Sequence, residues 1–287
     1  MPFSDYMAEQ LGHVELSPAG PFEAGSHVSL TLTYFAGKFG IDDSGAIKLS
    51  WRTASDSGKP QFDDPRAPNY VTARASNGAA MAIEYNRNNI RPWVNTILVR
   101  MVGGFLREGD RIEIRIGDRS GNSLGYRIQT CCDKDFQFKP FVDAFATYDF
   151  VPLPHSPRIV LRPGPVARWK AYVPTVRRRG EPFRLAIVAE DRWGNPTDQV
   201  SRSLRLVGPQ LVGLPDEVTF RPGQMTCEIE GIRSELCGDH SIDLTGSDGE
   251  LLGRSNPIRI VEDASLNWYW GDLHGQSNET VGTNDID

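Results

Sequence analysis

The sequence predicts an all-β protein with two antiparallel β-sandwich domains, the second of them immunoglobulin-like. Apolar and polar residues alternate with period two over many short stretches, which is typical of strands with one buried face. The 28 glycines and 20 prolines among 287 residues exceed average usage and favour short elements joined by turns. No stretch has the spacing of a long amphipathic helix, and residues 3–11 are expected to form two helical turns at most.

An N-terminal tail is expected over residues 1–9, and the first sandwich domain over 10–153. Its clearest strand covers 28–34, where Val, Leu, Leu and Tyr alternate with Ser and Thr residues that face solvent. The same alternation at 47–51 and 112–116 predicts two further strands, and Gly, Asp and Asn residues on both sides of the last one indicate tight turns. We therefore expect antiparallel strands joined by short loops.

A change in composition marks the end of the first domain. Three prolines between Val151 and Pro157 cannot occupy a central strand and stiffen a connector, so a domain boundary is predicted there. The second sandwich is expected over 156–264, with strands at 183–189, 204–206, 218–220, 227–229, 242–244 and 258–260. About seven short strands over this length are typical of an immunoglobulin-like sandwich. The string EDRWGNPTD after the first of these strands resembles a strand and turn of bacterial immunoglobulin-like domains.

The charge balance and the first residues indicate the compartment and the classes of partner. Lys and Arg number 31 and Asp and Glu 37, so the net charge of −6 provides no positive field for a polyphosphate backbone, and nucleic acid is not expected as a partner. No segment approaches the length of a membrane span, and the N-terminal residues lack a secretory signal, so no membrane partner and a cytoplasmic location are expected. No pattern decides the oligomeric state.

The four cysteines are expected to be free buried thiols, because no C-x-x-C spacing is repeated. A disulfide between Cys227 and Cys237 across a hairpin is the alternative for an exported chain. The adjacent Cys131 and Cys132 have Lys134 nearby but no His beside them to lower a thiol pKa, so a redox role is the less favoured interpretation.

Polar side chains that suit a metal ion follow a short aromatic run near the C-terminus. Asp272, His274 and Gln276 alternate along this segment, and residues two apart on a strand share one face. A neutral imidazole suits Zn, Mn or Fe, and a nearby carboxylate adds an anionic ligand or fixes the His tautomer. These three residues are therefore the candidate metal ligands. The segment resembles the opening strand of a metallohydrolase barrel.

Four strings carry a resemblance to a known family, namely YWGDLHGQSNETVGT, VSLTLTYFAGKFGIDDSG, QFDDPRAPNYVTARAS and AEDRWGNPT. Together they resemble the N-terminal half of the family named domain of unknown function 3604. Its members are similar to PHP-type and amidohydrolase-type metal-dependent hydrolases, with a distorted barrel whose first strand carries a His-x-His metal motif. His274 matches the first histidine of that motif, whereas Gln276, a poor ligand for a borderline metal ion, stands at the second position.

The resemblance implies a non-catalytic role for this chain. Only 13 residues follow His274, whereas a barrel needs roughly 200 or more, so residues 265–287 are expected to be a linker and the first strand of an absent barrel. The chain is then the accessory β-sandwich region of a metal-dependent hydrolase, a phosphoesterase by its likeness to PHP proteins, and is inactive as a fragment. Its partner is the downstream catalytic domain of the same chain. The resemblance implies a divalent metal, Zn, Mn or Fe, in a full-length parent only and none in this fragment, and it leaves the catalytic residues unknown.

The alternative function is a carbohydrate- or protein-binding module, or a spacer. An aromatic platform for sugars is one form of it, built from Trp51, Trp93, Trp169 and Trp193, although Trp51 is in phase with the apolar face of its strand and is expected in the core.

Two sets of charged residues offer further candidate sites. Asp42, Asp43, Asp63 and Asp64 provide oxygen ligands of the kind that Ca²⁺ binds, but Asp before Pro or Gly is ordinary turn chemistry, and the turn interpretation is favoured. Residues 177–179 are three arginines that can grip a phosphate or carboxylate. A solvated hairpin tip is the favoured interpretation of that run.

Overall fold

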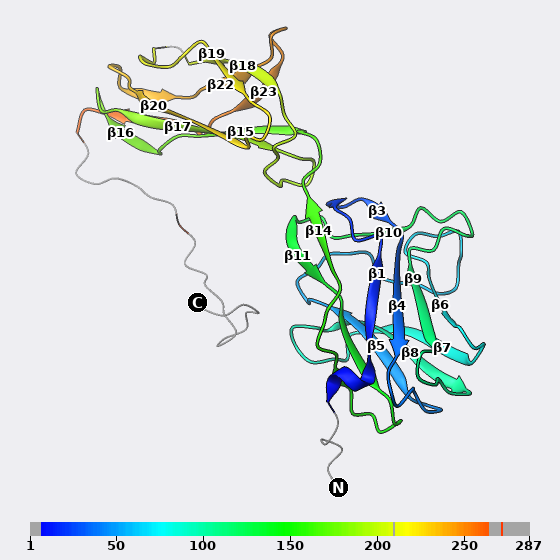
Figure 1. The fold of residues 1–287 in the computed structure, drawn as a ribbon. Helices are drawn as coiled ribbons and strands as arrows, with labels where there is room; N and C mark the ends of the chain where they lie inside the picture. Colours follow the sequence, from blue (N-terminus) through cyan, green and yellow to red (C-terminus); the bar gives the residue numbers. More distant parts are fainter. Residues whose placement is uncertain (1–6, 209, 264–270, 272–287) are drawn as a thin grey trace. The chain divides into compact units, whose positions relative to one another are not determined.

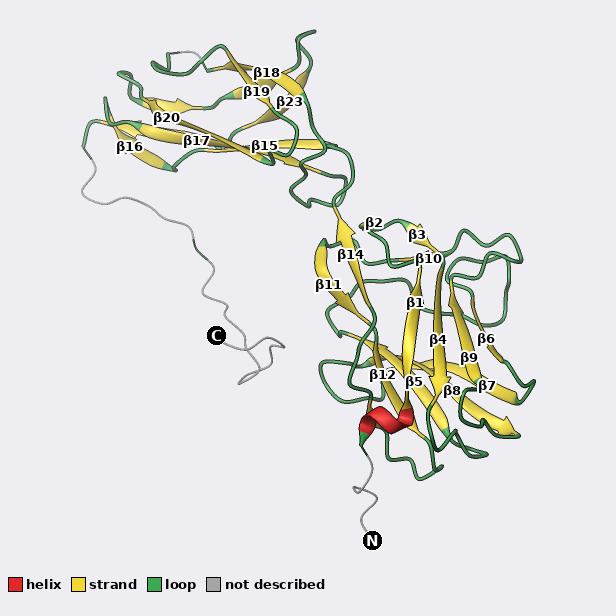
Figure 2. Cartoon of the chain, in the orientation of Figure 1, coloured by secondary structure: helices red, strands yellow, loops and turns green. Residues whose placement is uncertain are grey.

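The computed structural model describes residues 7–208, 210–263 and 271, and they form two compact units (Figure 1). Within the described part of the chain, unit 1 ends at Arg162 and unit 2 begins at Pro163. Strands make up nearly all the regular structure, and the described part of the expected N-terminal tail leads into one 3-10 turn, η2 (Ala8–Leu11) (Figure 2). Among the described residues, no helix combines the length and the apolar character needed to cross a lipid bilayer.

The boundary between the units differs from the one expected at residues 153–156. Strand β14 (Arg158–Arg162) belongs to unit 1, where it pairs with β11 (Asp133–Gln137) and, in parallel, with β2 (Phe22–Glu23). Its Ile159 and Leu161 are buried in the core of unit 1. The proline-rich segment contains β13 (Val151–Pro152), which pairs with one strand only and forms the edge of its sheet. Proline, which has no N–H group to donate, is tolerated on an edge strand because one side of such a strand has no neighbouring strand.

Unit 1 is a β-sandwich of two main sheets. Sheet I has the order β1-β4-β9-β6, with bounds Gly12–Ser17, Leu30–Ala36, Arg111–Ile116 and Val71–Ala75. Sheet II has the order β13-β12-β5-β8-β7, in which the last four strands cover Lys139–Asp143, Ala46–Trp51, Asn95–Gly103 and Ala80–Asn86. The pairings within both sheets are antiparallel. A short ribbon of β10 (Tyr126–Arg127) and β3 (His27–Val28) adds to the unit.

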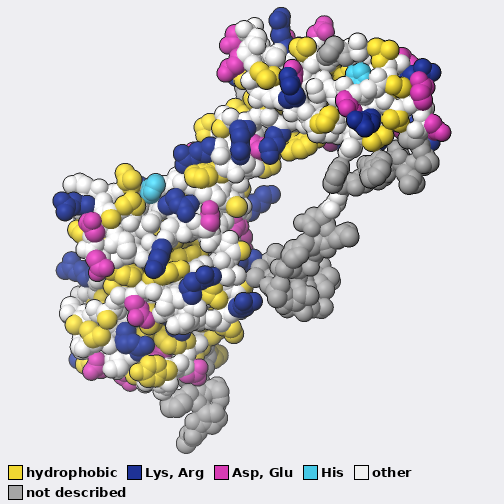
Figure 3. Space-filling model, turned by 180° about the vertical axis from the view of Figure 1, so that it is seen from behind, with side chains coloured by type: hydrophobic (Ala, Val, Ile, Leu, Met, Phe, Trp, Pro, Cys, Tyr) yellow, Lys and Arg dark blue, Asp and Glu magenta, His cyan; other side chains and the backbone are white. Residues whose placement is uncertain are grey.

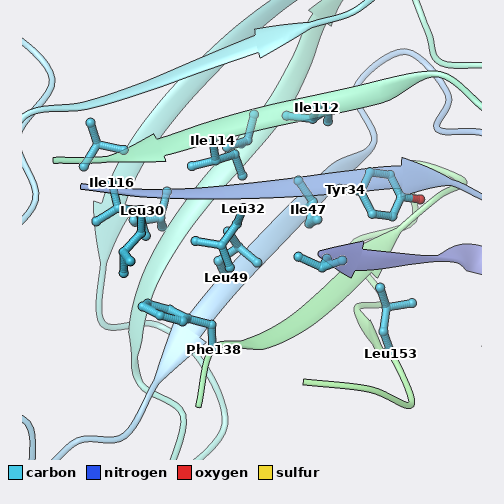
Figure 4. Close-up of a cluster of buried hydrophobic side chains, with 14 of the residues drawn as sticks. Leu30, Leu32, Tyr34, Ile47, Leu49, Ile112, Ile114, Ile116, Phe138 and Leu153 are labelled. Carbon is cyan, nitrogen blue, oxygen red and sulfur yellow. The ribbon is translucent and has the colours of Figure 1, made fainter. Parts of the chain in front are cut away.

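The core of unit 1 follows the predicted alternation. On β4, Leu30, Leu32 and Tyr34 are buried, whereas Thr31, Thr33 and Phe35 on the other face are partly exposed. Figure 4 shows the buried side chains of β4 and β9 gathered with those of β5, namely Leu30, Leu32, Tyr34, Ile112, Ile114, Ile116, Ile47 and Leu49. The hydroxyl of Tyr34 donates a hydrogen bond of 2.6 Å to the carbonyl of Leu11, so the one polar atom of this side chain is satisfied inside the core.

Strand β8 was not predicted, because both of its faces are largely buried and its sequence does not alternate. The continuous run Ile97, Leu98 and Val99 is buried throughout. On the side away from the core, Ser50 and Thr96 share a hydrogen bond of 2.8 Å, and Asn89 of the β7–β8 connection donates to Ser50 at 2.9 Å. That connection therefore covers part of the outer face of sheet II.

Unit 2 is an immunoglobulin-like β-sandwich with its own core. One sheet is β15-β17-β20, over Arg168–Tyr172, Phe183–Glu190 and Thr226–Ile232. A second is β19-β18-β22-β23, over Glu217–Phe220, Arg202–Val207, Asp243–Thr245 and Leu251–Arg254. A third is β16-β24-β21, over Val176–Arg178, Ile258–Val261 and Gly238–His240. Trp169 and Phe220 meet edge to face in the core, with ring centroids 4.8 Å apart.

The string EDRWGNPTD forms the turn at the end of β17, and a buried carboxylate organises it. Asp191 Oδ1 accepts hydrogen bonds from the backbone N–H groups of Trp193 (2.8 Å) and Asn195 (2.9 Å). Its Oδ2 accepts from the backbone N–H of Gly164 (3.1 Å) and from the side chain of Asn195 (2.8 Å). Burial alone raises the pKa of Asp191, but these hydrogen bonds outweigh it and hold the pKa below its usual value.

Candidate functional site

The residues predicted to bind a metal lie outside the described part of the chain. Asp272, His274 and Gln276 belong to the residues that the structure does not describe, and so does the rest of the expected barrel strand apart from Gly271. Within residues 7–208, 210–263 and 271, no group of three or more His, Cys, Asp or Glu side chains is arranged to hold a metal ion.

The aspartates considered for calcium take part in turns. The backbone N–H groups of Asp63 and Asp64 both donate to Gln61 Oε1 at 3.0 Å, and Asp64 Oδ1 accepts from the backbone of Arg66 at 2.9 Å. The carbonyl of Asp42 closes another turn by accepting from Gly45 at 2.9 Å. This geometry supports the favoured interpretation of these residues as turn formers.

The three arginines at 177–179 are each paired with a carboxylate, so they do not form an open anion site. Arg177 lies 3.7 Å from Glu181, and Arg178 lies 3.7 Å from Asp263. Arg179 lies 3.1 Å from Glu262. These are exposed or partly exposed pairs at the end of β16, as the interpretation of a solvated run expects.

The cysteines are free, as predicted, but they are not buried. Cys131, Cys132 and Cys237 are exposed, and Cys227 is partly exposed on β20. The prediction of buried thiols is wrong because three of the four lie outside the inward positions of strands, in connections or next to them. The alternative disulfide between Cys227 and Cys237 is absent from the structure.

The tryptophans of the described residues do not form a common platform. Trp51 is 2% exposed in the core of unit 1, as its phase in the strand predicted, and Trp169 belongs to the separate core of unit 2. Trp193 is 41% exposed in the turn after β17, with the Arg192 guanidinium 4.5 Å from its ring. Trp93 lies in the β7–β8 connection below Arg52, at 5.6 Å.

Unit 1 carries an open groove where β5 and β7 end and β8 begins, which we call the Tyr85 groove. Its volume is about 510 Å³, and its lining consists of Trp51, Thr53, Ser55, Ser57, Lys59, Tyr85, Asn86, Arg87 and Asn95. The lining combines two aromatic rings, two amides, three hydroxyl side chains and two cations. It contains no carboxylate.

The strand register explains how the aromatic side of the groove forms. Trp51 is the last residue of β5 and lies opposite Asn95, whereas Tyr85, near the end of β7, lies opposite Ile97. The rings of Trp51 and Tyr85 are therefore stacked, with centroids 5.9 Å apart and planes 28° from parallel. Beneath them, Tyr126 and Phe138 contact Trp51 edge to face at 6.3 Å each, which fixes its orientation.

The opposite wall of the groove is the connection that follows β5, and hydrogen bonds hold it in place. Asn95 Nδ2 donates to the carbonyl of Arg52 at 2.7 Å, and the backbone N–H of Gly58 donates to the carbonyl of Arg127 at 2.8 Å. Both carboxylate oxygens of Asp56 accept from Thr130, at 2.8 Å and 2.7 Å. Burial alone raises the pKa of Asp56, but these bonds and the charge of Arg127 outweigh it and keep the pKa below its usual value. The wall is therefore preformed and does not have to be ordered by a ligand.

The polar side chains of the groove are already oriented by one another. The hydroxyl of Tyr85 donates a hydrogen bond of 3.0 Å to Asn95 Oδ1, and Arg87 donates to the Thr53 hydroxyl at 3.2 Å. Ser55 and Ser57 share a hydrogen bond of 2.7 Å. Burial raises the pKa of Tyr85, although the charge of Arg87 opposes the shift, so the phenol keeps its proton at neutral pH. The groove thus offers hydroxyl, amide and cationic donors around an aromatic ring.

Sequence reasoning did not find this groove. Its lining comes from three strand ends and two connections, and the residues are separated by up to 44 positions in the chain, from Trp51 to Asn95. One signal was present, because Met81, Ile83 and Tyr85 alternate with Ala82 and Glu84 and place Tyr85 on the inward face at the end of a strand. The distribution of charge does not mark the groove either. In the view of Figure 3, Lys and Arg side chains are interspersed with Asp and Glu side chains over the surface.

No protein-family model matches this sequence, and no curated protein matches it. Solved structures to which it is similar include the D00-D0 domain of intimin, with 8% identity, a TM-score of 0.32, and coverage of 87% of this chain and 100% of that one. The FN1-FN3 domains of chicken CNTN1 match at 11% identity and a TM-score of 0.28, over 89% of this chain and 68% of that one. The Escherichia coli adhesin FdeC matches at 10% identity and a TM-score of 0.25, over 90% and 66%. At such scores, the strand pairing described above remains the basis for assigning two β-sandwich units.

Proposed function

We propose that the chain is a non-catalytic binding module and that unit 1 holds carbohydrate in the Tyr85 groove. The observation that carries this proposal is the lining, in which stacked aromatic rings lie among amide, hydroxyl and cationic side chains without a carboxylate. A sugar presents an apolar face of C–H groups and a rim of hydroxyls. The apolar face packs on an aromatic ring, and the hydroxyls exchange hydrogen bonds with side chains such as Asn86 and Arg87.

The same lining argues against catalysis of glycosidic bond cleavage at this groove. Most glycoside hydrolases need two carboxyl groups on either side of the scissile bond, one as acid and one as base or nucleophile. The residues that line the Tyr85 groove supply neither. Its charged members, Lys59 and Arg87, are cationic donors that can hold a hydroxyl oxygen.

Binding to a panel of neutral polysaccharides tests the proposal, with Trp fluorescence and calorimetry as readouts. A ligand seated on Tyr85 is expected to change the emission of the underlying Trp51. Replacement of the ring by Tyr85→Ala should weaken binding by about tenfold or more, because a stacking surface and a hydroxyl are both lost. Tyr148→Ala removes an exposed tyrosine from another connection of unit 1 and is the matched control. Failure of every neutral polysaccharide to bind, or equal losses in both variants, would contradict the proposal.

The C-terminal sequence supports a second proposal, that this chain is the accessory region of a metal-dependent hydrolase of the family named domain of unknown function 3604. The supporting observation is the alternation of Asp272, His274 and Gln276 after an aromatic run. We expect a version extended along the native gene to contain a divalent metal by mass spectrometry, and His274→Ala to lose it. Metal content that does not change with His274→Ala would remove the support for this second role.

A further inference from the structure

The outward face of sheet I carries a second surface with a different chemistry, which we call the arginine face. Arg111 and Arg115 on β9 and Arg74 on β6 point away from the core and are exposed. They line a hollow of about 450 Å³ together with Thr33, Phe35, Ala75, Ser76 and Glu113. The only carboxylate in this lining is that of Glu113.

The strand register places these side chains in rows across the sheet. Phe35 of β4 lies between His13 of β1 and Arg111 of β9. In the next row Glu113 lies between Thr33 and Arg74. Neighbouring strands are about 4.8 Å apart and alternate residues on a strand about 7 Å apart, so the cations are spread over the face and are not stacked in one spot.

Two of the three guanidinium groups have no acidic partner among the described residues. Arg115 is paired with Glu113 at 2.6 Å, which satisfies the carboxylate of the hollow. Arg74 and Arg111 form no salt bridge with any described carboxylate, and the Arg111 guanidinium lies 5.9 Å from the Phe35 ring. A guanidinium presents a planar fork of N–H donors that matches a carboxylate or a sulfate.

Phe35, which lines the hollow, forms an aromatic pair with His13 of the neighbouring strand. The ring of His13 stacks on that of Phe35, with centroids 4.8 Å apart and planes 7° from parallel. Phe35 is partly exposed, and His13, on the edge strand β1, is exposed and lies 3.6 Å from Glu15. An aromatic ring that can contact the apolar face of a sugar therefore lies next to a guanidinium group that can bind the acidic group of that sugar.

We propose that the arginine face binds an anionic polysaccharide, with Arg74 and Arg111 holding its carboxylate or sulfate groups and the His13–Phe35 pair contacting its sugar rings. The density of charge selects this class over nucleic acid. Duplex DNA carries one negative charge per about 1.7 Å. Such a polymer is repelled by Glu113, which lies between Arg111 and Arg115 on β9, and by Glu15 on the edge strand β1 of the same face. A polysaccharide with charges spaced along its chain can avoid them.

This site lies on the outward face of sheet I, whereas the Tyr85 groove is built from the ends of strands of sheet II, so the two proposals can fail separately. The experiment is affinity electrophoresis and calorimetry of the whole chain with polygalacturonate, dextran sulfate, neutral dextran and duplex DNA. We expect polygalacturonate or dextran sulfate to bind, and the one that binds more tightly identifies the acidic group. Affinity should fall roughly five- to tenfold between 50 and 200 mM salt, as expected for about two ionic contacts.

The variants decide which residues carry the binding. The double change Arg74→Gln and Arg111→Gln should weaken binding by tenfold or more, and Thr33→Glu, which adds a carboxylate in the middle of the face, should do the same. Arg158→Gln removes an exposed arginine of unit 1 that is already paired with Asp135, and Tyr85→Ala alters the other site, so both should leave binding within twofold of the original. Absence of binding to both acidic polymers, tighter binding of DNA, or equal losses in the Arg158→Gln control would overturn the proposal.

Discussion

At the scale of single residues, the buried carboxylate of Asp191 has the clearest energetic role. It is fully buried and accepts four hydrogen bonds, three from the turn that it closes and one from the backbone N–H of Gly164, and it forms no salt bridge with any described residue. Asp191→Ala removes the acceptor and leaves several N–H groups without a partner. We expect the free energy of unfolding of unit 2 to fall by about 3 kcal/mol in urea denaturation. Asp198→Ala, an exposed aspartate of the same loop, is the control and should have little effect.

The same residue predicts a dependence of stability on pH. Because the pKa of Asp191 is lower in the folded state than its unfolded value of about 3.9, its contribution is complete above that pH. It is lost as the pH falls through the folded pKa. The difference in unfolding free energy between the original chain and Asp191→Ala should therefore be constant near neutral pH and shrink below about pH 4. A difference that stays the same down to pH 2 would show that the carboxylate is not stabilised by its charge.

At the scale of the element, the alternation of inward and outward residues on strand β4 predicts which of its side chains stabilise unit 1. Leu32 is fully buried between the sheets, whereas its neighbour Thr33 is outward. Leu32→Ala is expected to cost unit 1 about 2–5 kcal/mol of unfolding free energy through the cavity it leaves. Thr33→Ala should change the unfolding free energy by no more than about 0.5 kcal/mol. Comparable losses at the two positions would mean that the outward face of β4 is packed against something.

Elements differ in how far the sequence alone could predict them. Strands β4, β9 and β17 alternate cleanly, because each has one buried and one more open face. Strand β5 alternates in sequence as well, although Ala46 and Ser50 on its outer face are also buried. Strand β8 lacks that signal, since both of its faces are largely buried and the β7–β8 connection covers part of the outer face of its sheet. The turn at Asp191 was predicted from a local string, whereas the Tyr85 groove depends on the register that brings Trp51 opposite Asn95. Residues that come together only through the pairing register of distant strands leave no local sequence pattern, so the groove could not be predicted from the sequence.

At the scale of the whole molecule, the two hydrophobic cores share no residue. The core of unit 1 draws its buried residues from Leu11 to Leu161, and that of unit 2 from Trp169 to Ile260. We expect two unfolding transitions in calorimetry, with Leu32→Ala lowering the temperature of one and Asp191→Ala that of the other. Separate chains over 7–162 and 163–263 should each fold. If either variant lowered both transitions by the same amount, the two units would be unfolding as one cooperative structure.

The position of β14 determines when unit 1 can be completed during synthesis. This strand is the last of the unit, yet it pairs with β2 near the start of the chain as well as with β11. Phe22 therefore has no strand partner until Leu161 has emerged from the ribosome, and contacts between residues so distant in sequence form slowly. A nascent chain that stalls before β14 would leave the edges of β2 and β11 open to pairing with other chains. Residues 158–162 thus complete the pairing of β2 and β11, and we expect them to protect the newly made protein from aggregation by covering those edges.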